Sequence, residues 1–373
     1  MYKKYKKIYF LNAIRTDIHS GGNTSSIELI KNIKKEINPK IKNISLQPFY
    51  EKNNFKFFYT FASFPAPFFV LLNRFSNLIF TEFLLRFSIF YFLKFFLMQL
   101  FIKPDMVVFN HHSSFIYAFL FLRSKKIFVW HDLPSNNYSR KSIFVKLILL
   151  KFERNFLNIS DINLTFSNTD KKYINRFYKR ECHLISCINN SIYKRQAEIN
   201  QNCILLIANW KRPQNYEGAF EFFKLYSNLM NKNLNRDNGF DFVIAGNASE
   251  SFIKKIKKIK NISKKVSFIE NYKDLAEFNQ IALLAPINDG AGIKLKTLEA
   301  WSFSIPVIGT KQAFSGLPKN LWSYGGHMLD SVEKLALFCL NRKLFQEVVH
   351  KLNPTKSFSM YQDIYNEFNE IKK

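Results

Sequence analysis

The stretch 283–310, LLAPINDGAGIKLKTLEAWSFSIPVIGT, constrains the fold more than any other part of this chain. Residues 281–286 are apolar and end in a polar loop, which is typical of a buried strand followed by a tight turn. From 293 to 302 the apolar residues follow helical spacing, and 305–308 is a second apolar run. A strand, a Gly-rich loop, a helix and a strand form a βαβ unit, so the stretch predicts a parallel sheet.

The loop of this unit has the composition of a phosphate site. Gly290 and Gly292 remove side chains just before the predicted helix, where free N–H groups and the positive end of the helix dipole favour an anion. Lys294 and Lys296 add cations, and Glu299 follows with a carboxylate that can accept hydrogen bonds from a pair of hydroxyls. The pattern predicts a nucleotide-diphosphate site, and the alternative is an ordinary Gly-rich turn with solvated lysines.

The whole run, G-A-G-I-K-x-K-x-x-L-E-A followed by I-P-V-I-G-T, resembles the nucleotide-sugar half of retaining GT-B glycosyltransferases of the group 1 type. The resemblance implies that Glu299 binds the nucleotide ribose and that residues 313–318 lie near the nucleotide. Many members have a Glu against the donor sugar where this chain has Ala291, which leaves the contact with the sugar open; Asp289 is the nearest candidate. The turn that the resemblance assigns to the donor diphosphate comprises Gly290, Ala291, Gly292, Ile293 and Lys294.

Two further turns resemble parts of the same family. A predicted strand at 8–11 is followed by a loop with Gly21 and Gly22 and by a helix from about 24, and the resemblance implies that this loop lies near the donor phosphates and the acceptor. A tight turn without a ligand is the alternative. After a predicted strand at 203–208, Lys211 or Arg212 matches a basic residue that the family places against the diphosphate. A second Lys of that turn in many members is Glu217 here.

Polar clusters follow two predicted strands of the N-terminal half. The strand 106–110 ends in His111-His112-Ser113-Ser114, and the strand 126–130 ends in His131-Asp132. Open α/β sheets bind ligands at the carboxyl ends of their strands. His131-Asp132 also resembles the His-containing turn on the acceptor side of the family, so His131, Asp132 and Lys294 are the candidate catalytic residues. Glu153 is predicted to be a structural ion-pair partner.

The predicted fold class is α/β of the GT-B type, with two Rossmann-like domains whose parallel sheets face a cleft. A length of 373 residues suits two domains with a core each. The predicted boundaries are 1–188 for an acceptor-binding domain, 189–202 for a polar linker, 203–355 for the nucleotide-sugar domain, and 356–373 for a helix that crosses back to the first domain.

Charge and aromatic content indicate an anionic partner. The formal net charge is +27, and 42 Phe are concentrated early in the chain. No nucleic-acid-binding signature accompanies them, so an anionic membrane surface is favoured over nucleic acid. Residues 64–80, with Arg74 among Phe, Pro and Leu, are predicted to lie at the membrane interface, whereas 83–102 is interrupted by Arg86 and Lys94 and is too short to span a bilayer. The alternative is a wholly buried helical pair.

The predicted function is transfer of a sugar from a UDP- or GDP-type donor to a glycan or lipid-linked acceptor, with retention, in surface polysaccharide or lipopolysaccharide biosynthesis. The predicted location is the cytoplasmic face of the cell membrane, because no secretory signal is present. No cofactor or metal is expected: the four Cys fit no metal-ligand spacing, and no Asp-x-Asp signature occurs. The alternatives are a GT-B nucleotide-sugar 2-epimerase and a non-enzymatic basic protein that binds lipid or nucleic acid through charge.

Overall fold

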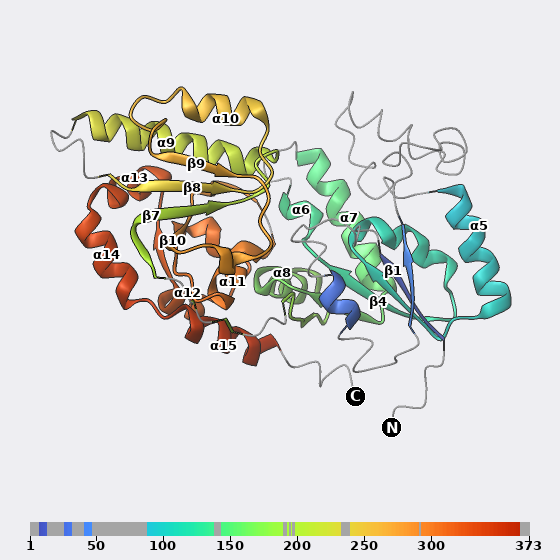
Figure 1. Ribbon diagram of the computed structural model, residues 1–373. Helices are drawn as coiled ribbons and strands as arrows, with labels where there is room; N and C mark the ends of the chain where they lie inside the picture. Colours follow the sequence, from blue (N-terminus) through green and yellow to red (C-terminus); the bar gives the residue numbers. More distant parts are fainter. Residues whose placement is uncertain are drawn as a thin grey trace. The chain divides into compact units, whose positions relative to one another are not determined.

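The computed structural model describes residues 7–12, 26–31, 41–46, 88–137, 143–188, 192–193, 195, 198–232, 239–290 and 292–365. The chain forms two compact units, Met1–Cys187 and Ile188–Lys373, each built around one parallel sheet (Figure 1). The division falls one residue before the predicted end of the first domain. Each unit is described in turn.

Unit 1 has a six-stranded sheet of β1 (Ile8–Asn12), β2 (Lys42–Ser45), β3 (Met106–Asn110), β4 (Lys125–Trp130), β5 (Ile162–Thr165) and β6 (His183–Leu184). Its helical segments are α5 (Ile89–Leu97), the π-helix η2 (Met98–Ile102), the 3-10 helix η3 (His112–Leu120), α6 (Pro134–Asn137), α7 (Ile143–Ile159), α8 (Asn168–Tyr173) and the π-helix η4 (Ile174–Tyr178). Residues 26–31 are also helical.

The sheet order of unit 1 is β2-β1-β3-β4-β5-β6, with all neighbours parallel. The predicted strands at 8–11, 106–110 and 126–130 are confirmed to within one residue, because each is an apolar run buried on both faces of the sheet. β2 and β6 were not predicted. β2 is a polar edge strand whose only large apolar side chain is Ile44, and β6 is two residues long, so neither has a sequence pattern to detect.

Helix α5 is two-sided. Tyr91 and Phe95 are buried against Tyr117 of η3, and Met98 continues the buried face into η2. This confirms that part of 83–102 is core. The other face exposes large apolar side chains, and the predicted interfacial segment 64–80 lies outside the described residues. Within the described ranges, no helix is both long enough and apolar enough to cross a bilayer.

Unit 2 has a second six-stranded sheet of β7 (Asn200–Ile207), β8 (Asp241–Ala245), β9 (Val266–Ile269), β10 (Gln280–Ala285), β11 (Val307–Thr310) and β12 (Gly326–Leu329). Its helices are α9 (Pro213–Lys232), α10 (Glu250–Lys257), η5 (Leu275–Glu277), α11 (Leu295–Ser302), η6 (Lys311–Phe314), α12 (Lys319–Gly325), α13 (Val332–Leu340), α14 (Arg342–Lys351) and α15 (Pro354–Tyr365).

The sheet order of unit 2, β12-β11-β10-β7-β8-β9, is the Rossmann order, in which the direction of winding reverses between the first and fourth strands. Helices α9, α10, α13 and α14 pack with the strands in one large apolar core, and α11, α12 and α15 lie together on the opposite side of the sheet (Figure 1). The reversal between β7 and β10 places their carboxyl ends side by side, which is where such sheets bind ligands.

Three predicted boundaries in unit 2 need correction. β7 begins at Asn200, inside the predicted linker 189–202, because backbone pairing with residues 279–280 does not require apolar side chains. β11 begins at Val307 instead of 305, since Pro306 has no N–H to donate and the N–H of Ile305 bonds to Ala300 at the end of α11. α11 begins at Leu295, two residues after the predicted start.

The last helix, α15, packs on α11 and α12 within unit 2. Phe358 and Tyr361 are fully buried, and Ser357 Oγ donates to the carbonyl of Leu321 at 2.7 Å. Residues 366–373 lie outside the described residues, so the predicted crossing to the first domain by 356–373 stays a prediction.

Candidate functional site

The Gly-rich turn that follows β10 is held in a conformation that only glycine adopts readily. Gly290 has φ 124° and Gly292 has φ 69°, both in the left-handed region. The carbonyl of Gly290 accepts hydrogen bonds from Lys294 Nζ at 3.1 Å and from Gln312 Nε2, and Ser315 Oγ donates to the carbonyl of Gly292 at 3.1 Å. Side chains therefore hold the backbone at Gly290 and at Gly292, the described residues on either side of position 291.

The loop after η6 presses against this turn. Gly316 has φ 81°, and a Cβ there would lie 2.7 Å from Ile293 Cα and 2.9 Å from Ile293 N. The resemblance had placed residues 313–318 near the nucleotide, and the structure packs this loop on the Gly-rich turn. Gln312 was missed, because an isolated Gln before this loop has no pattern that marks it.

The N-terminus of α11 is cationic and has no side-chain cap. Lys296 lies in its first turn, enclosed by protein, and its Nζ donates to Asn215 Oδ1 of α9 at 3.3 Å. Burial, and then the charges of Lys294 and Arg212, lower the pKa of Lys296 to about 7. A cation whose charge is this costly would be stabilised strongly by an anion beside it.

Arg212 belongs to this cation cluster, and it comes from the turn after β7. Asn209 shapes that turn: its Oδ1 accepts from the N–H of Lys211 at 3.1 Å, and its carbonyl accepts from the N–H of Arg212 at 3.2 Å. Both basic side chains are exposed. The charge of Arg212 is one of those that lower the pKa of Lys296, and the choice between Lys211 and Arg212 as the diphosphate contact stays a prediction.

Glu299 lies one turn into α11 and is largely enclosed. Burial, and then the charge of Asp274, raise the pKa of Glu299 to about 7. Burial and the charge of Glu299 in turn raise the pKa of Tyr272 to about 12, which places all three side chains in one neighbourhood. A carboxylate with these neighbours is suited to accept hydrogen bonds from neutral hydroxyl groups.

The described predicted residues of unit 1, His131 and Asp132, follow β4, the strand next to the switch point between β1 and β3. Asn110 Nδ2 donates to Asn12 Oδ1 at 2.8 Å and to Ser26 Oγ at 2.9 Å. Asn110 Oδ1 is 2.8 Å from His131 Nε2 and can only accept, so His131 carries its proton on Nε2. Burial, and then the charge of His112, lower the pKa of His131 to about 3, and the ring is neutral at physiological pH. Its Nδ1 is thereby an acceptor.

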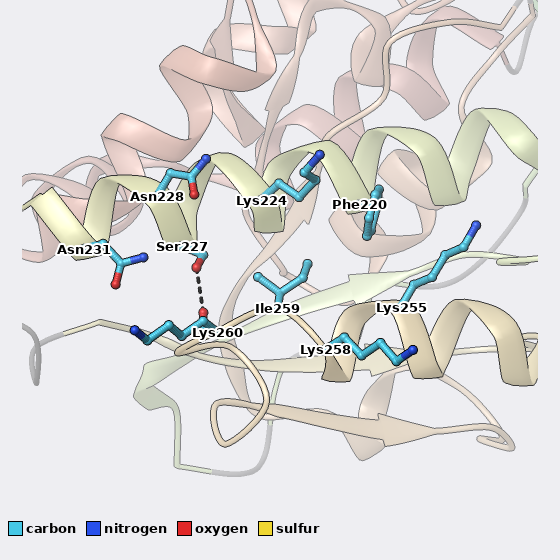
Figure 2. A pocket seen from close by; sticks show the side chains of 9 residues that line it. All are labelled: Phe220, Lys224, Ser227, Asn228, Asn231, Lys255, Lys258, Ile259 and Lys260. Carbon is cyan, nitrogen blue, oxygen red and sulfur yellow. Dashed lines mark hydrogen bonds between the residues drawn. The ribbon is translucent and has the colours of Figure 1, made fainter.

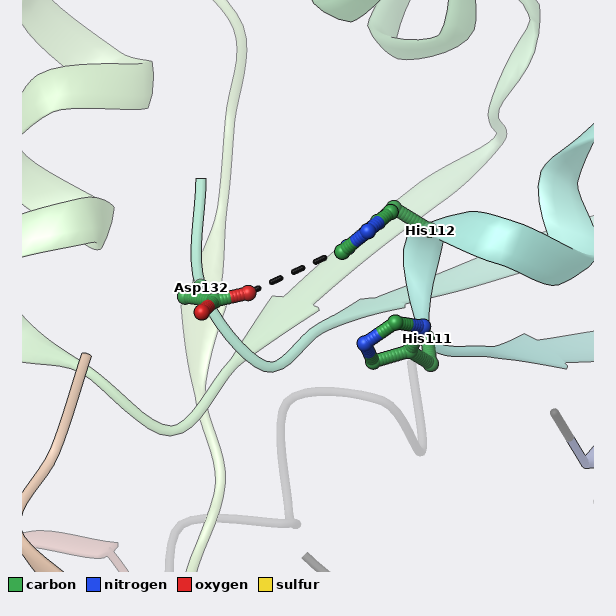
Figure 3. A group of neighbouring side chains, drawn as sticks. All are labelled: His111, His112 and Asp132. Atoms are coloured by element: carbon green, nitrogen blue, oxygen red, sulfur yellow. Dashed lines mark ion pairs between the residues drawn. The ribbon is translucent and has the colours of Figure 1, made fainter. Parts of the chain in front are cut away.

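A second group of side chains lies beside this network. His111 and His112 follow β3, Asp132 follows β4, and one ligand atom from each lies within 4.8 Å of the others (Figure 3). His112 Nδ1 is 3.8 Å from Asp132 Oδ1, and the two His rings are 3.9 Å apart. Sequence analysis singled out the two strand ends but not this grouping.

The prediction that Glu153 is an ion-pair partner is wrong. The carboxylate is fully buried and accepts hydrogen bonds from Ser135 N–H at 2.7 Å, Ser135 Oγ at 2.8 Å and Tyr178 Oη, while burial raises its pKa. It therefore anchors the start of α6, just after His131-Asp132, by hydrogen bonds instead of charge pairing.

A shallow hollow between α9 and α10 is lined by none of the predicted site residues (Figure 2). Its lysines are exposed, as expected for a solvated helix face. Of the predicted site residues, Gly21, Gly22 and Ala291 lie outside the described residues.

Comparisons with known proteins find similar proteins both for part of unit 2 and for the whole chain. Residues 201–329 match the family model described as glycosyl transferases group 1. None of the curated proteins matches the chain by sequence.

Solved structures resemble the whole chain. TarM matches with a TM-score of 0.66 at 12% identity, covering 98% of this chain and 97% of TarM. Sucrose-phosphate synthase from Thermosynechococcus elongatus matches with a TM-score of 0.69 at 13% identity and covers 98% of both chains. HepE from Anabaena, in complex with UDP and glucose, matches with a TM-score of 0.59 at 12% identity over 98% of this chain and 99% of HepE. The chain has the GT-B fold, and residues 201–329 of its second unit are similar to group 1 glycosyl transferases.

Proposed function

We propose that this protein transfers a hexose from a nucleotide-sugar, of the UDP or GDP type, to a glycan or lipid-linked acceptor with retention of anomeric configuration. The observation that supports this most directly is that two positive-φ glycines lie near three cations, Lys294, Lys296 and Arg212, at the switch point of the unit 2 sheet. The UDP complexes of HepE and of S. aureus MnaA support a uridine diphosphate as the first ligand to test.

The donor would bind with its diphosphate on the Gly-rich turn and its ribose on Glu299. The bond that breaks joins the anomeric carbon to the diphosphate, so negative charge grows on the leaving group. Lys294, Lys296, Arg212 and the free N–H groups of α11 would stabilise that charge without a metal. A bound diphosphate would also raise the pKa of Lys296 and hold it protonated.

The acceptor would bind to unit 1, near His131 and Asp132. Neutral His131, which is half-buried and held by Asn110, offers its Nδ1 as an acceptor for a sugar hydroxyl. Such a group orients a hydroxyl without introducing charge. The new bond joins the acceptor oxygen to the anomeric carbon on the side that the diphosphate leaves, and the proton of that hydroxyl would pass to the departing diphosphate.

A lipid-linked acceptor in surface polysaccharide or lipopolysaccharide biosynthesis would require attachment to the inner face of the membrane. Helix α5 supports this, because its outward face exposes several large apolar side chains around a single cation, Lys94. Apolar side chains enter the headgroup region, and cations meet anionic lipid. The exposed apolar residues of α5 and η2 are Ile89, Phe90, Phe92, Leu93, Phe96, Leu97, Leu100 and Phe101.

A nucleotide-diphosphate site also suits a GT-B nucleotide-sugar 2-epimerase, so the test must separate the two reactions. UDP, GDP and their common sugar conjugates are screened for thermal stabilisation, and the best donor is then incubated with and without glycan or polyprenyl-linked acceptors. The proposal expects nucleoside diphosphate release that depends on the acceptor. Conversion of the free nucleotide-sugar without acceptor would support the epimerase, and steeply salt-dependent binding of any polyanion without donor stabilisation would support a non-enzymatic basic protein.

A further inference from the structure

His111, His112 and Asp132 form a cluster that the proposed transfer does not use as a unit. His111 and His112 come from the end of β3 and Asp132 from the end of β4, and these strands are neighbours paired in register from Met106–Lys125 to Asn110–Val129. The N–H of His111 extends this ladder by bonding to the carbonyl of Val129 at 3.1 Å. The cluster is therefore positioned by the rigid part of the sheet.

The backbone brings two adjacent imidazoles to the same side. Successive side chains of a strand point to opposite faces, and His111 breaks that alternation with φ 76° and ψ 141°. A non-glycine residue in this region is strained, and such strain concentrates at functional sites. As a result the two rings lie 3.9 Å apart, with Asp132 beside His112 (Figure 3).

The donor set has the chemistry of a transition-metal site. Two imidazoles and one carboxylate suit Zn²⁺ or Co²⁺, whereas Mg²⁺ prefers oxygen ligands and water. His111 Nδ1 lies 2.9 Å from Ser113 Oγ and 3.3 Å from the backbone N of Ser113. In the tautomer that binds a metal through Nε2, the Nδ1–H donates to Ser113 Oγ, which is the outer hydrogen bond that metal-bound His usually make. The Asp132 side chain is 27% exposed, so an ion and its water ligands can reach the cluster.

The three donor atoms need to move only slightly closer together to bind one ion. Donor atoms around a tetrahedral Zn²⁺ lie roughly 3.4 Å apart, given bonds of about 2.0–2.1 Å. Here His112 Nδ1 and Asp132 Oδ1 are 3.8 Å apart, and the three donors lie within 4.8 Å of one another.

We propose that His111, His112 and Asp132 bind one first-row transition-metal ion, with Zn²⁺ as the preferred occupant, and that the ion links the ends of β3 and β4 in unit 1. This is separate from the diphosphate site of unit 2, where the chain supplies its own cations. It does not depend on sugar transfer, so it is tested by binding.

The test uses the full chain, freed of any affinity tag and of bound metal by a chelator that is then removed. Co²⁺ is titrated in and followed by its visible d–d absorption, and Zn²⁺ is titrated by calorimetry. One ion per chain is expected. Asp132→Asn, which keeps the side-chain shape, and His112→Ala should each weaken binding by at least about tenfold. Exposed His350 supplies the matched control, and His350→Ala should bind as the parent does.

A third variant identifies the ligand directly. His112→Cys with Co²⁺ should add thiolate-to-cobalt charge-transfer absorption, which the parent lacks because its four Cys are all buried. The proposal is overturned if the parent binds no stoichiometric ion, or if Asp132→Asn and His112→Ala bind as tightly as the parent. The first result would leave His112 and Asp132 as an ion pair without a metal.

Discussion

The switch points of the two sheets differ in the chemical character of the residues that form them. In unit 2 the carboxyl ends of β7 and β10 lead into two positive-φ glycines and the cations Lys294, Lys296 and Arg212. In unit 1 the ends of β1 and β3 hold the buried amides Asn12 and Asn110, which bond to each other, and Asn110 also bonds to the neutral imidazole that follows β4. The first is suited to bind a charged group that arrives with the ligand, and the second to hold neutral hydrogen-bonding groups in fixed positions. Under the proposed function, the same fold would bind a charged donor in unit 2 and an uncharged acceptor hydroxyl in unit 1.

The largest effect is expected from a substitution in unit 2, at the glycine that packs against the backbone of the Gly-rich turn. Gly316→Val places a side chain where a Cβ alone would lie 2.7 Å from Ile293 Cα, at a φ of 81° that Val rarely adopts. The Gly-rich turn must move, and UDP affinity should fall by roughly a hundredfold, consistent with strain of about 3 kcal/mol. Calorimetric titration with UDP measures it. Lys319→Ala, exposed at the start of α12, is the control and should bind UDP as the parent does.

The next prediction concerns a substitution at the switch point of unit 1. Asn110→Leu keeps the branching of the side chain at Cγ but withdraws hydrogen bonds from Asn12, Ser26 and His131. The loss should be about 2–4 kcal/mol of unfolding free energy. Hydrogen exchange should increase in β1 and β3 and stay unchanged in β10 and α11, with UDP affinity within about twofold of the parent. Equal loss of protection in both units would show that the two switch points are not independent.

The contrast also explains what the sequence could predict. Gly290, Gly292, Lys294, Lys296 and Glu299 lie within ten consecutive residues, so one local pattern was enough to predict most of the proposed donor site. The partners in unit 1 are far apart: Asn110 bonds to Asn12 over a separation of 98 residues and to Ser26 over 84.

No local pattern reports such pairings, and the His111–His112–Asp132 grouping likewise depends on the register of two strands. The edge strands β2, β6 and β12 escaped prediction for a related reason, since an edge strand is fixed by one neighbour and needs no continuous apolar run. The fold class was predictable because the buried central strands have such runs.

A smaller effect is expected when one cation of the unit 2 switch point is removed. Lys296→Met removes the half-buried cation while keeping most of the length of the side chain, and UDP affinity should fall by roughly ten- to thirtyfold, as for a lost charge-assisted hydrogen bond. The pKa of Lys296 is lowered to about 7, so above that value the parent must take up a proton to bind the diphosphate, and affinity should decrease as pH rises through 7. Titrations in buffers of different ionisation enthalpy measure the uptake, which Lys296→Met should lack and Lys311→Met, at an exposed lysine, should keep.

The smallest effect concerns Glu299, whose pH dependence has the opposite sign. Burial and Asp274 raise its pKa to about 7, and the ionised carboxylate is the stronger acceptor, so its contribution to ribose binding should grow as pH rises through 7. Glu299→Gln should weaken UDP binding by about three- to tenfold above that pH and by less below it. The ribose role is isolated by repeating the titrations with 2′-deoxy- and 3′-deoxy-UDP: the parent should discriminate against at least one of them, and Glu299→Gln should lose that discrimination. If both proteins discriminate between UDP and the deoxy nucleotides by the same ratio of affinities, Glu299 does not bind the ribose. The diphosphate turn would then be the only assigned part of the donor site.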